Sequence, residues 1–210
     1  MFAQPLVPVI VLDDATLAEP LAEALLNGGL RVMEITFRTT AAEAAIRCIA
    51  KKFPDIFIGA GTVLNATHVQ RARDAGAQFF VSPGLHPATV AAARETGLPI
   101  LPGVCTPTEV EAALALNCTV LKFFPAEAAG GVKMLKALAG PYAHTGVKFC
   151  PTGGITADNM RDYLRLPIVA AVGGSWMVDS KLINARRFDD ITRLTKEALA
   201  SIDNHRQQST

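Results

Sequence analysis

Short apolar runs alternate with amphipathic, alanine-rich stretches along the whole chain, and no linker-like segment interrupts this alternation. Strands that are buried on both faces have such continuous apolar runs, and the stretches between them are long enough for helices. The pattern therefore predicts eight strand–helix units that repeat at intervals of roughly 20–25 residues. The predicted strands begin at Val7, Arg31, Ile56, Gln78, Pro99, Thr119, Val147 and Ile168.

Parallel strands that alternate with helices form either a closed (β/α)8 barrel or an open, doubly wound sheet. The open sheet usually carries a glycine-rich nucleotide loop after its first strand. Here the first run leads instead into Asp13-Asp14-Ala15-Thr16. We therefore predict an α/β fold of the single-domain (β/α)8 TIM-barrel class over residues 1–210. Its core would span about 7–178, with a C-terminal helix over about 186–202.

Several helix boundaries are marked by residues that cap helices. Thr40-Ala-Ala-Glu43 and Thr106-Pro-Thr-Glu109 both fit the capping box, and Pro107 suits the first position of a helix. Thr156 is a candidate N-cap for a helix that runs through Asp158 and Asn159. Glycines occur where helices are expected to end: Gly28, Gly29, Gly76 and Gly97.

The charge balance limits the kinds of partner. Lys and Arg total 20, Asp and Glu total 19, and the formal net charge is +1. Proteins that bind nucleic acid or anionic lipid carry a basic patch or stripe, so we expect neither nucleic acid nor membrane as a partner. Half of the residues are hydrophobic, which is ample for a core. A small molecule is the expected partner.

The cysteines and the apolar segments indicate a cytoplasmic protein. The four cysteines lie far apart without a C-x-x-C pair, so neither a disulfide framework nor a zinc site is expected. Free thiols fit a reducing compartment. The longest apolar stretch, Ile168–Val178, is shorter than the roughly 20 residues of a spanning helix. The N-terminal residues lack the basic region of a signal peptide.

The second run carries polar residues at alternate positions. Glu34, Thr36 and Arg38 share one parity and would point into the barrel, whereas the apolar residues between them would face the helices. Catalytic groups of such barrels sit at the carboxyl ends of strands. A buried Glu34–Arg38 pair without catalytic use is the alternative, because a charge inside a barrel must be paired.

The sixth run holds one lysine, Lys122, among apolar neighbours. Its parity would aim it into the barrel from the wall opposite Glu34, with room for a carbonyl carbon between them. A neutral amine is needed to attack a carbonyl, and desolvation by neighbouring phenylalanines and a nearby cation would both favour that form. The alternative is a structural lysine paired only to Glu34.

Three loops are candidate anion sites. Gly59-Ala60-Gly61-Thr62 closes the third run and could hold a carboxylate, whereas Pro151–Ile155 and Gly173–Ser175 end the seventh and eighth runs. The loops after strands seven and eight commonly bind phosphate in such barrels, because glycines let backbone N–H groups approach the anion. Tight turns without a ligand are the alternative.

Seven motifs taken in order resemble one known family. The resemblance runs from about Val7 to Val178 and is to the bifunctional 2-keto-3-deoxy-6-phosphogluconate (KDPG) and 4-hydroxy-2-oxoglutarate (KHG) aldolases. The motifs are Glu34-Ile35-Thr36-Phe37-Arg38-Thr39, Gly59-Ala60-Gly61-Thr62-Val63, Ser82-Pro83-Gly84, Pro102-Gly103-Val104, Lys122-Phe123-Phe124-Pro125-Ala126-Glu127, Pro151-Thr152-Gly153-Gly154-Ile155 and Gly173-Gly174-Ser175-Trp176.

The resemblance implies a class I, Schiff-base aldolase of the Entner–Doudoroff pathway that needs no metal and no cofactor and is usually a homotrimer. Its substrates would be a phosphorylated 2-keto-3-deoxy sugar acid, cleaved to pyruvate and glyceraldehyde 3-phosphate, and 4-hydroxy-2-oxoglutarate. Lys122 would form the Schiff base and Glu34 would be the general acid/base. By motif position the substrate-binding residues would be Arg38 and Thr62 at the pyruvate carboxylate, Pro83 and Phe124 at the pyruvate pocket, and Gly153, Gly154, Gly174 and Ser175 at the phosphate loops.

Three rival functions remain open from the residues. A phosphogalactonate aldolase has the same chemistry and the other configuration at C4, although Phe37-Arg38-Thr39 favours the gluconate type. A phosphate-binding barrel isomerase or synthase without covalent chemistry leaves Lys122 without a purpose. A phosphosugar-binding sensor would bind without turnover.

Overall fold

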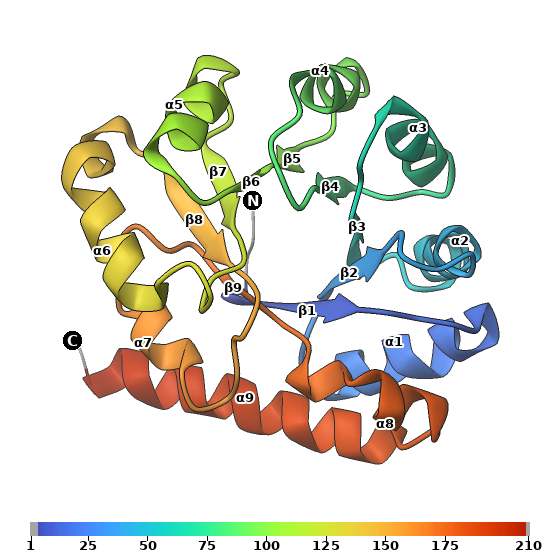
Figure 1. The fold of residues 1–210 in the computed structure, drawn as a ribbon. Coiled ribbons are helices and arrows are strands. Elements are labelled where there is room, and N and C mark those ends of the chain that lie inside the picture. The colour runs from blue at the N-terminus through green and yellow to red at the C-terminus, as the bar shows by residue number, and fades with distance from the viewer. Residues whose placement is uncertain (1–3, 209–210) are drawn as a thin grey trace.

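Strands lie at the centre of the molecule and helices surround them (Figure 1). This computed structural model describes residues 4–208. The strands are β1 (Leu6–Ile10), β2 (Val32–Thr36), β3 (Phe57–Gly61), β4 (Phe79–Val81), β5 (Ile100–Leu101), β6 (Gly103–Val104), β7 (Val120–Phe123), β8 (Lys148–Pro151) and β9 (Val172–Gly174). The α-helices are α1 (Ala18–Asn27), α2 (Ala42–Lys52), α3 (Ala66–Asp74), α4 (Pro87–Glu95), α5 (Pro107–Ala115), α6 (Gly131–Tyr142), α7 (Met160–Leu164), α8 (Ser180–Asn184) and α9 (Phe188–Gln208). Short 3-10 helices span Ala15–Leu17, Ala143–Thr145 and Trp176–Val178.

All eight predicted strand runs form parallel strands, and the fifth is divided into β5 and β6 at Pro102. The strands hydrogen-bond in two sheets, with orders β5-β4-β3-β2-β1-β9 and β6-β7-β8. Between the two sheets, a parallel bridge pairs Thr152 with Gly173. The α/β class is confirmed, with a parallel sheet that curls around the centre. One continuous eight-stranded ladder is not formed by the described residues.

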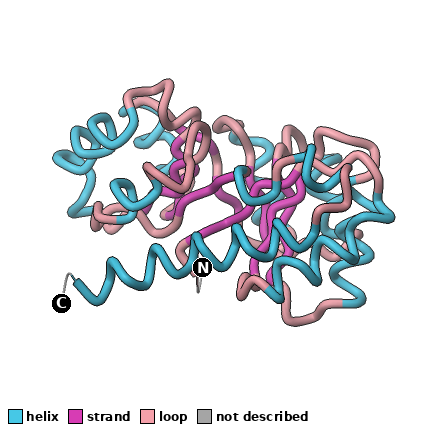
Figure 2. The backbone as a smooth tube through the Cα atoms, turned by 90° about the horizontal axis from the view of Figure 1, so that it is seen from below, coloured by secondary structure: helices cyan, strands magenta, loops and turns pink. Residues whose placement is uncertain are grey.

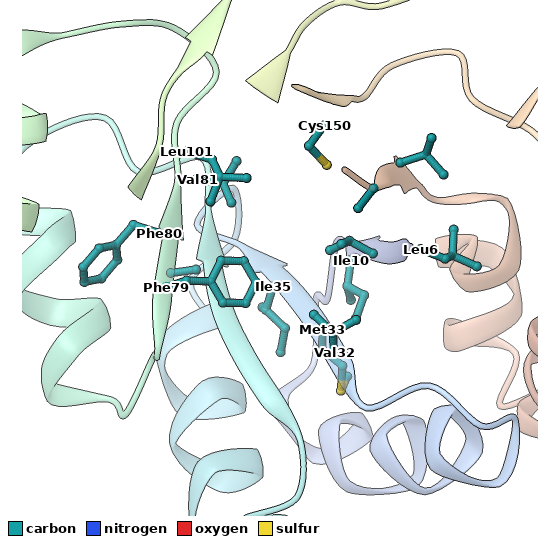
Figure 3. Close-up of a cluster of buried hydrophobic side chains, with 14 of the residues drawn as sticks. Leu6, Ile10, Val32, Met33, Ile35, Phe79, Phe80, Val81, Leu101 and Cys150 are labelled. Carbon is teal, nitrogen blue, oxygen red and sulfur yellow. The ribbon is translucent and has the colours of Figure 1, made fainter. Parts of the chain in front are cut away.

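Large aromatic side chains fill the interior toward the amino ends of the strands. Phe57 and Phe79 stack there, with ring centroids 4.8 Å apart. A Cβ added at Gly59 would overlap the Phe79 ring, so the glycine provides the space for that ring. Figure 3 shows Phe79 and its neighbour Phe80 on opposite sides of β4, as the alternation of a strand requires. Phe79 belongs to the buried core, and the partly buried Phe57 packs against it.

The structure confirms one of the two predicted capping boxes. At Thr106 both bonds of the box are present, and Pro107 occupies the first turn of α5. At Thr40 the prediction is wrong: α2 begins at Ala42, and its N-cap, Ala41, has no side chain that could cap the helix. The Glu43 carboxylate pairs with two arginines instead of turning back to the helix start.

The predicted helix at Thr156 begins later than expected, whereas the glycine signals are confirmed. Asn159 is the N-cap of α7, which starts at Met160, although the Thr156 hydroxyl still accepts a hydrogen bond from the Asn159 N–H at 3.4 Å. The glycines Gly29, Gly76 and Gly97 follow helix ends with positive φ angles, where a side chain would be strained.

The C-terminal helix α9 runs along the outside of the molecule beside α1 (Figures 1 and 2). The Thr192 hydroxyl donates a hydrogen bond to the carbonyl of Ala24. Gly28 lies against Thr195, where a Cβ would clash. The predicted domain covers 1–210, and its residues 1–3 and 209–210 lie outside the described residues. Within residues 4–208, no helix is both long and apolar enough to cross a membrane.

Candidate active site

A cavity of about 310 Å³ opens where the strands end. It is bounded by the ends of β1, β2, β7 and β9 and by the segments that follow β3, β4 and β8, which is where barrel enzymes place their active sites. Every site residue predicted from the sequence lines this cavity except Glu34. The lining residues are Val9, Thr36, Arg38, Thr62, Pro83, Lys122, Phe124, Thr152, Gly153, Gly154, Ile155, Gly173, Gly174 and Ser175.

Glu34 does not line the cavity itself, but it contacts Lys122, which does. Its Oε1 lies 3.5 Å from the Lys122 Nζ, and both residues are buried, with 3% and 6% of their surface exposed. Glu34 Oε1 accepts no hydrogen bond from the described residues, so the contact is an ion pair without hydrogen-bond geometry. A buried carboxylate oxygen without a donor is uncommon and indicates a group held for a ligand or for proton transfer. The two side chains extend from β2 and β7, as their parity predicted.

Gly61 on β3 makes room for the Glu34 carboxylate. A Cβ added at Gly61 would overlap the carboxylate oxygen Oε1 and press on Cδ and Cγ. In the register of β2 with β3, Glu34 is the Cα partner of Gly59, and Thr36 is the Cα partner of Gly61. The Glu34 side chain therefore leans diagonally, toward the end of β3. Because Gly61 has no side chain, the Glu34 carboxylate can lie against β3 and still reach Lys122.

Lys122 has an aromatic neighbour, as expected. Its Nζ lies 5.2 Å from the centre of the Phe124 ring, which also lines the cavity. The charged group in contact with Nζ is the Glu34 carboxylate, whereas the prediction was a nearby cation; Arg38 lines the same cavity. The carboxylate is thus placed to accept the proton that the amine must lose before it attacks a carbonyl.

Cys150 lies beside this pair on β8, as the Cα partner of Lys122. Burial raises the pKa of the Cys150 thiol to about 12, and the negative charge of Glu34 acts in the same direction, whereas Lys122 acts against it. The thiol is therefore protonated at neutral pH. At that pH Cys150 is an uncharged neighbour of the Glu34–Lys122 pair and not a nucleophile.

A chain of hydrogen bonds holds Arg38 beside the cavity. The Arg38 Nε donates to the Thr36 hydroxyl at 3.2 Å, and that hydroxyl donates to the carbonyl of Ile10 at 2.8 Å. Thr62, which directly follows the neighbouring strand β3, has a φ of 56°, an unusual conformation for a β-branched residue. Such outliers often occur at ligand sites, because the surrounding structure must hold them.

The turn after β8 has the form of an anion site. Gly153 and Gly154 have φ angles of 99° and 78°, which residues with side chains rarely adopt. Successive N–H groups in such turns can point to one side and form a nest for an anion. Gly174 and Ser175 of the neighbouring loop line the same cavity, and Gly174 packs so closely on Trp176 that a Cβ would clash.

Several lining residues were not among the predicted site residues. Thr152 directly follows β8, two residues beyond Cys150, and continuing the strand alternation by one residue would place it on the same side as Cys150. Thr36 was expected to point inward but was given no role. Ile155 and Gly173 belong to the two loops predicted as anion sites, although neither had a role of its own, and Val9 is apolar, so its residue type gave no signal. No group of three or more potential metal ligands occurs in the described part of the chain.

Comparison with known proteins gives consistent matches over nearly the whole chain. Residues 1–194 match the family described as KDPG and KHG aldolase. The 2-dehydro-3-deoxy-phosphogluconate aldolase of Haemophilus influenzae is 50% identical over 92% of this chain and 91% of its own. The KHG/KDPG aldolase of Escherichia coli K12 is 48% identical over 93% and 91%. A crystal structure of KDPG aldolase from Legionella pneumophila, with pyruvate captured as a covalent carbinolamine intermediate, is 43% identical, with a TM-score of 0.90 over 94% of this chain and 95% of that chain.

Proposed function

The chain belongs to the KDPG and KHG aldolase family, and from that premise we propose that it cleaves 2-dehydro-3-deoxy-6-phosphogluconate through a Schiff base on Lys122. The products are pyruvate and glyceraldehyde 3-phosphate. The observation that carries the proposal is the buried Lys122 amine at the cavity wall, 3.5 Å from a Glu34 oxygen that accepts no hydrogen bond. The same chemistry cleaves 4-hydroxy-2-oxoglutarate to pyruvate and glyoxylate, in line with the second activity in the family's description.

Imine formation uses both members of the pair. Glu34 accepts a proton from the Lys122 ammonium, and the neutral amine attacks the C2 ketone to form a carbinolamine. Glu34, through a water where needed, then returns the proton to the departing hydroxyl, so that water leaves and a protonated imine remains. The 3.5 Å separation is close enough for direct transfer after a small side-chain movement.

Bond cleavage uses the imine as an electron sink. Glu34, or the water that it holds, removes the C4 hydroxyl proton, the C3–C4 bond breaks, and its electron pair moves into the enamine. Glyceraldehyde 3-phosphate leaves, C3 of the enamine is protonated, and hydrolysis of the imine frees pyruvate and the amine. Arg38 holds the carboxylate so that the breaking bond stays perpendicular to the imine plane, a positioning effect.

The two ends of the substrate meet different parts of the cavity. Arg38 and Thr62 bind the carboxylate, and Pro83 and Phe124 enclose the three carbons that become pyruvate. The phosphate binds at the opposite end, where backbone N–H groups are its natural partners. The residues proposed there are Gly153, Gly154, Gly174 and Ser175.

We further propose that the two sheets are arcs of one closed (β/α)8 barrel and that the enzyme is a cytoplasmic homotrimer of the Entner–Doudoroff pathway. The barrel is supported by the single residue, Pro102, between β5 and β6 and by the bridge from Thr152 to Gly173. The trimer and the location rest on family membership. Light scattering of the purified protein should give three times the chain mass of 22.2 kDa.

Borohydride trapping tests the central proposal. The protein is incubated with pyruvate and borohydride, which reduces the imine to a stable secondary amine, and the modified residue is mapped by mass spectrometry. The expected adduct is on Lys122 alone, and the Lys122→Met variant should give none. Labelling of another lysine would refute the assignment. Comparing cleavage rates on the gluconate and galactonate epimers then tests the preference at C4.

A further inference from the structure

Two side chains that do not line the cavity lie behind the Gly153–Gly154 turn. Glu127 follows β7, and its backbone N–H donates a hydrogen bond to the Gly153 carbonyl at 3.0 Å. Tyr163 belongs to α7, and its hydroxyl donates a hydrogen bond to Oε1 of Glu127. The mechanism above uses neither residue. Together they connect the end of β7 with a helix on the outer side of the turn.

The diglycine turn is fixed from this outer side by packing and hydrogen bonds. A Cβ added at Gly154 would lie only 2.6 Å from Cγ of Glu127, so the stem of that side chain rests directly on the glycine. The Asn159 side-chain amide donates a hydrogen bond to the Gly154 carbonyl at 2.9 Å. The carbonyls of Gly153 and Gly154 therefore both accept hydrogen bonds on the side of the turn away from the cavity. The opposite side of the turn lines the cavity.

Tyr163 is suited to hold Glu127 in one place. The Tyr163 side chain is completely buried, with 0% of its surface exposed, so its hydroxyl needs a partner within the protein. Burial, followed by the hydrogen bond to Glu127, raises the pKa of Tyr163 well above its usual range. The hydroxyl therefore remains protonated, and a donor, at neutral pH. A hydrogen bond to a carboxylate is stronger than one between neutral groups.

The same segment carries the amine and this carboxylate. Lys122 extends from β7 into the cavity, and Glu127 lies in the turn that follows β7. A substrate that has its ketone at Lys122 and its phosphate at the diglycine turn requires a fixed distance between the Lys122 amine and that turn. A link between the β7 segment and the turn is a direct way to fix that separation.

We propose that the Glu127–Tyr163 hydrogen bond is a positioning element that holds the Gly153–Gly154 turn for the substrate phosphate and so sets the preference for phosphorylated substrates. The inference rests on the proposed function, since it assumes a phosphate at that turn. It predicts that loss of the bond weakens reactions of phosphorylated substrates and leaves reactions without a phosphate unchanged.

The test compares two reactions of one enzyme preparation. In Tyr163→Phe we expect kcat/KM for 2-dehydro-3-deoxy-6-phosphogluconate to fall about tenfold, mainly through KM, as for a lost hydrogen bond to a charged group. The rate constant for trapping pyruvate with borohydride should stay within about twofold. Both rates are normalised to the trapped fraction of protein, so partial misfolding does not alter their ratio.

Matched variants distinguish an effect on the position of the turn from a general loss of folding or activity. Glu127→Ala should behave like Tyr163→Phe, whereas Glu127→Gln keeps an oxygen that accepts from the tyrosine and should retain most of the phosphate preference. Tyr142→Phe removes a similar bond, from the Tyr142 hydroxyl to Glu111 at 2.9 Å, outside the cavity lining. It should leave the ratio unchanged.

Two results would overturn the inference. One is an unchanged ratio in Tyr163→Phe, whether both rates stay the same or both fall equally, and the other is the same shift of the ratio in Tyr142→Phe. A wild-type protein that pyruvate and borohydride do not label at Lys122 would instead overturn the proposed function. The two failures are therefore distinguishable.

Discussion

The Glu34 carboxylate lies against the bare Cα of Gly61, on the neighbouring strand, at a point where any side chain would overlap it. This contact directs the carboxylate toward Lys122, with 3.5 Å between Oε1 and Nζ. The distance between the two proposed catalytic groups thus depends on Gly61, a residue to which the proposed mechanism gives no chemical role. Replacing Glu34 and replacing Gly61 should change the Glu34–Lys122 pair in different ways, which leads to two predictions.

Glu34→Gln keeps the size and shape of the side chain and removes its ability to accept a proton. We expect pyruvate still to be trapped on Lys122, but more slowly, because the amine is present without its proton acceptor. Turnover should fall by about 10²–10⁴-fold, the usual contribution of a general acid/base. A coupled assay of pyruvate release measures turnover, and mass spectrometry measures trapping. Turnover close to that of the wild type would remove Glu34 from this role.

Gly61→Ala places a methyl group where the carboxylate lies. Because the overlapping atoms belong to the end of a flexible side chain, we expect the protein to fold and Glu34 to rotate away from Lys122. Turnover should fall toward that of Glu34→Gln, and the double variant should be little worse than either, since both act on one interaction. Gly140→Ala is the control, because its added Cβ meets no atom within 4 Å. Full independence of the two effects would contradict this account.

The alternation of side chains along strands predicts the centre of the site, whereas the other site residues were predicted from the family motifs. Glu34, Arg38 and Lys122 were placed in the interior by parity, and all three lie at or against one cavity. Strand alternation is reliable here because a shift of one residue would bury the wrong face of the whole strand. The break of the fifth strand also had a signal, since Pro102 has no N–H to donate to a neighbouring strand.

Contacts between distant segments could not be predicted in this way. Glu127 and Tyr163 are 36 residues apart, one in a loop and one in a short helix, and no periodic pattern connects them. Thr40 shows the same limit at a helix start. The capping-box pattern was present, but Arg71 from the neighbouring helix α3 and Arg47 from α2 itself bind the Glu43 carboxylate. Tertiary partners decided between two uses of one glutamate.

The cysteines should differ sharply in reactivity toward iodoacetamide. Alkylation requires the thiolate, and burial together with the charge of Glu34 raises the pKa of Cys150 to about 12. At pH 8 only about one Cys150 thiol in ten thousand is ionised, and raising the pH from 7 to 9 leaves it protonated. We expect mass spectrometry to show labelling of the half-buried Cys48 and Cys105 and none of Cys150. In denaturant all four cysteines should react. Labelling of Cys150 in the native protein as fast as that of Cys48 would show that the thiol is not enclosed.

The two predicted capping boxes provide a paired test of stability. Thr106→Ala removes the hydroxyl that accepts the Glu109 N–H, a bond of the box at the start of α5, and should lower the free energy of unfolding by about 1 kcal/mol. In a domain of this size that corresponds to a decrease in Tm of about 2–4 °C.

Thr40→Ala changes the same residue type in the same sequence pattern, but Thr40 precedes the N-cap of α2 and caps nothing. Its effect should stay within about 0.5 kcal/mol, as for surface substitutions away from caps. Urea unfolding followed by circular dichroism measures both changes under identical conditions. Equal losses in the two variants would mean that the helix starts do not differ as described, whereas a loss confined to Thr106 would show that the capping hydrogen bond, rather than the sequence pattern, stabilises the helix.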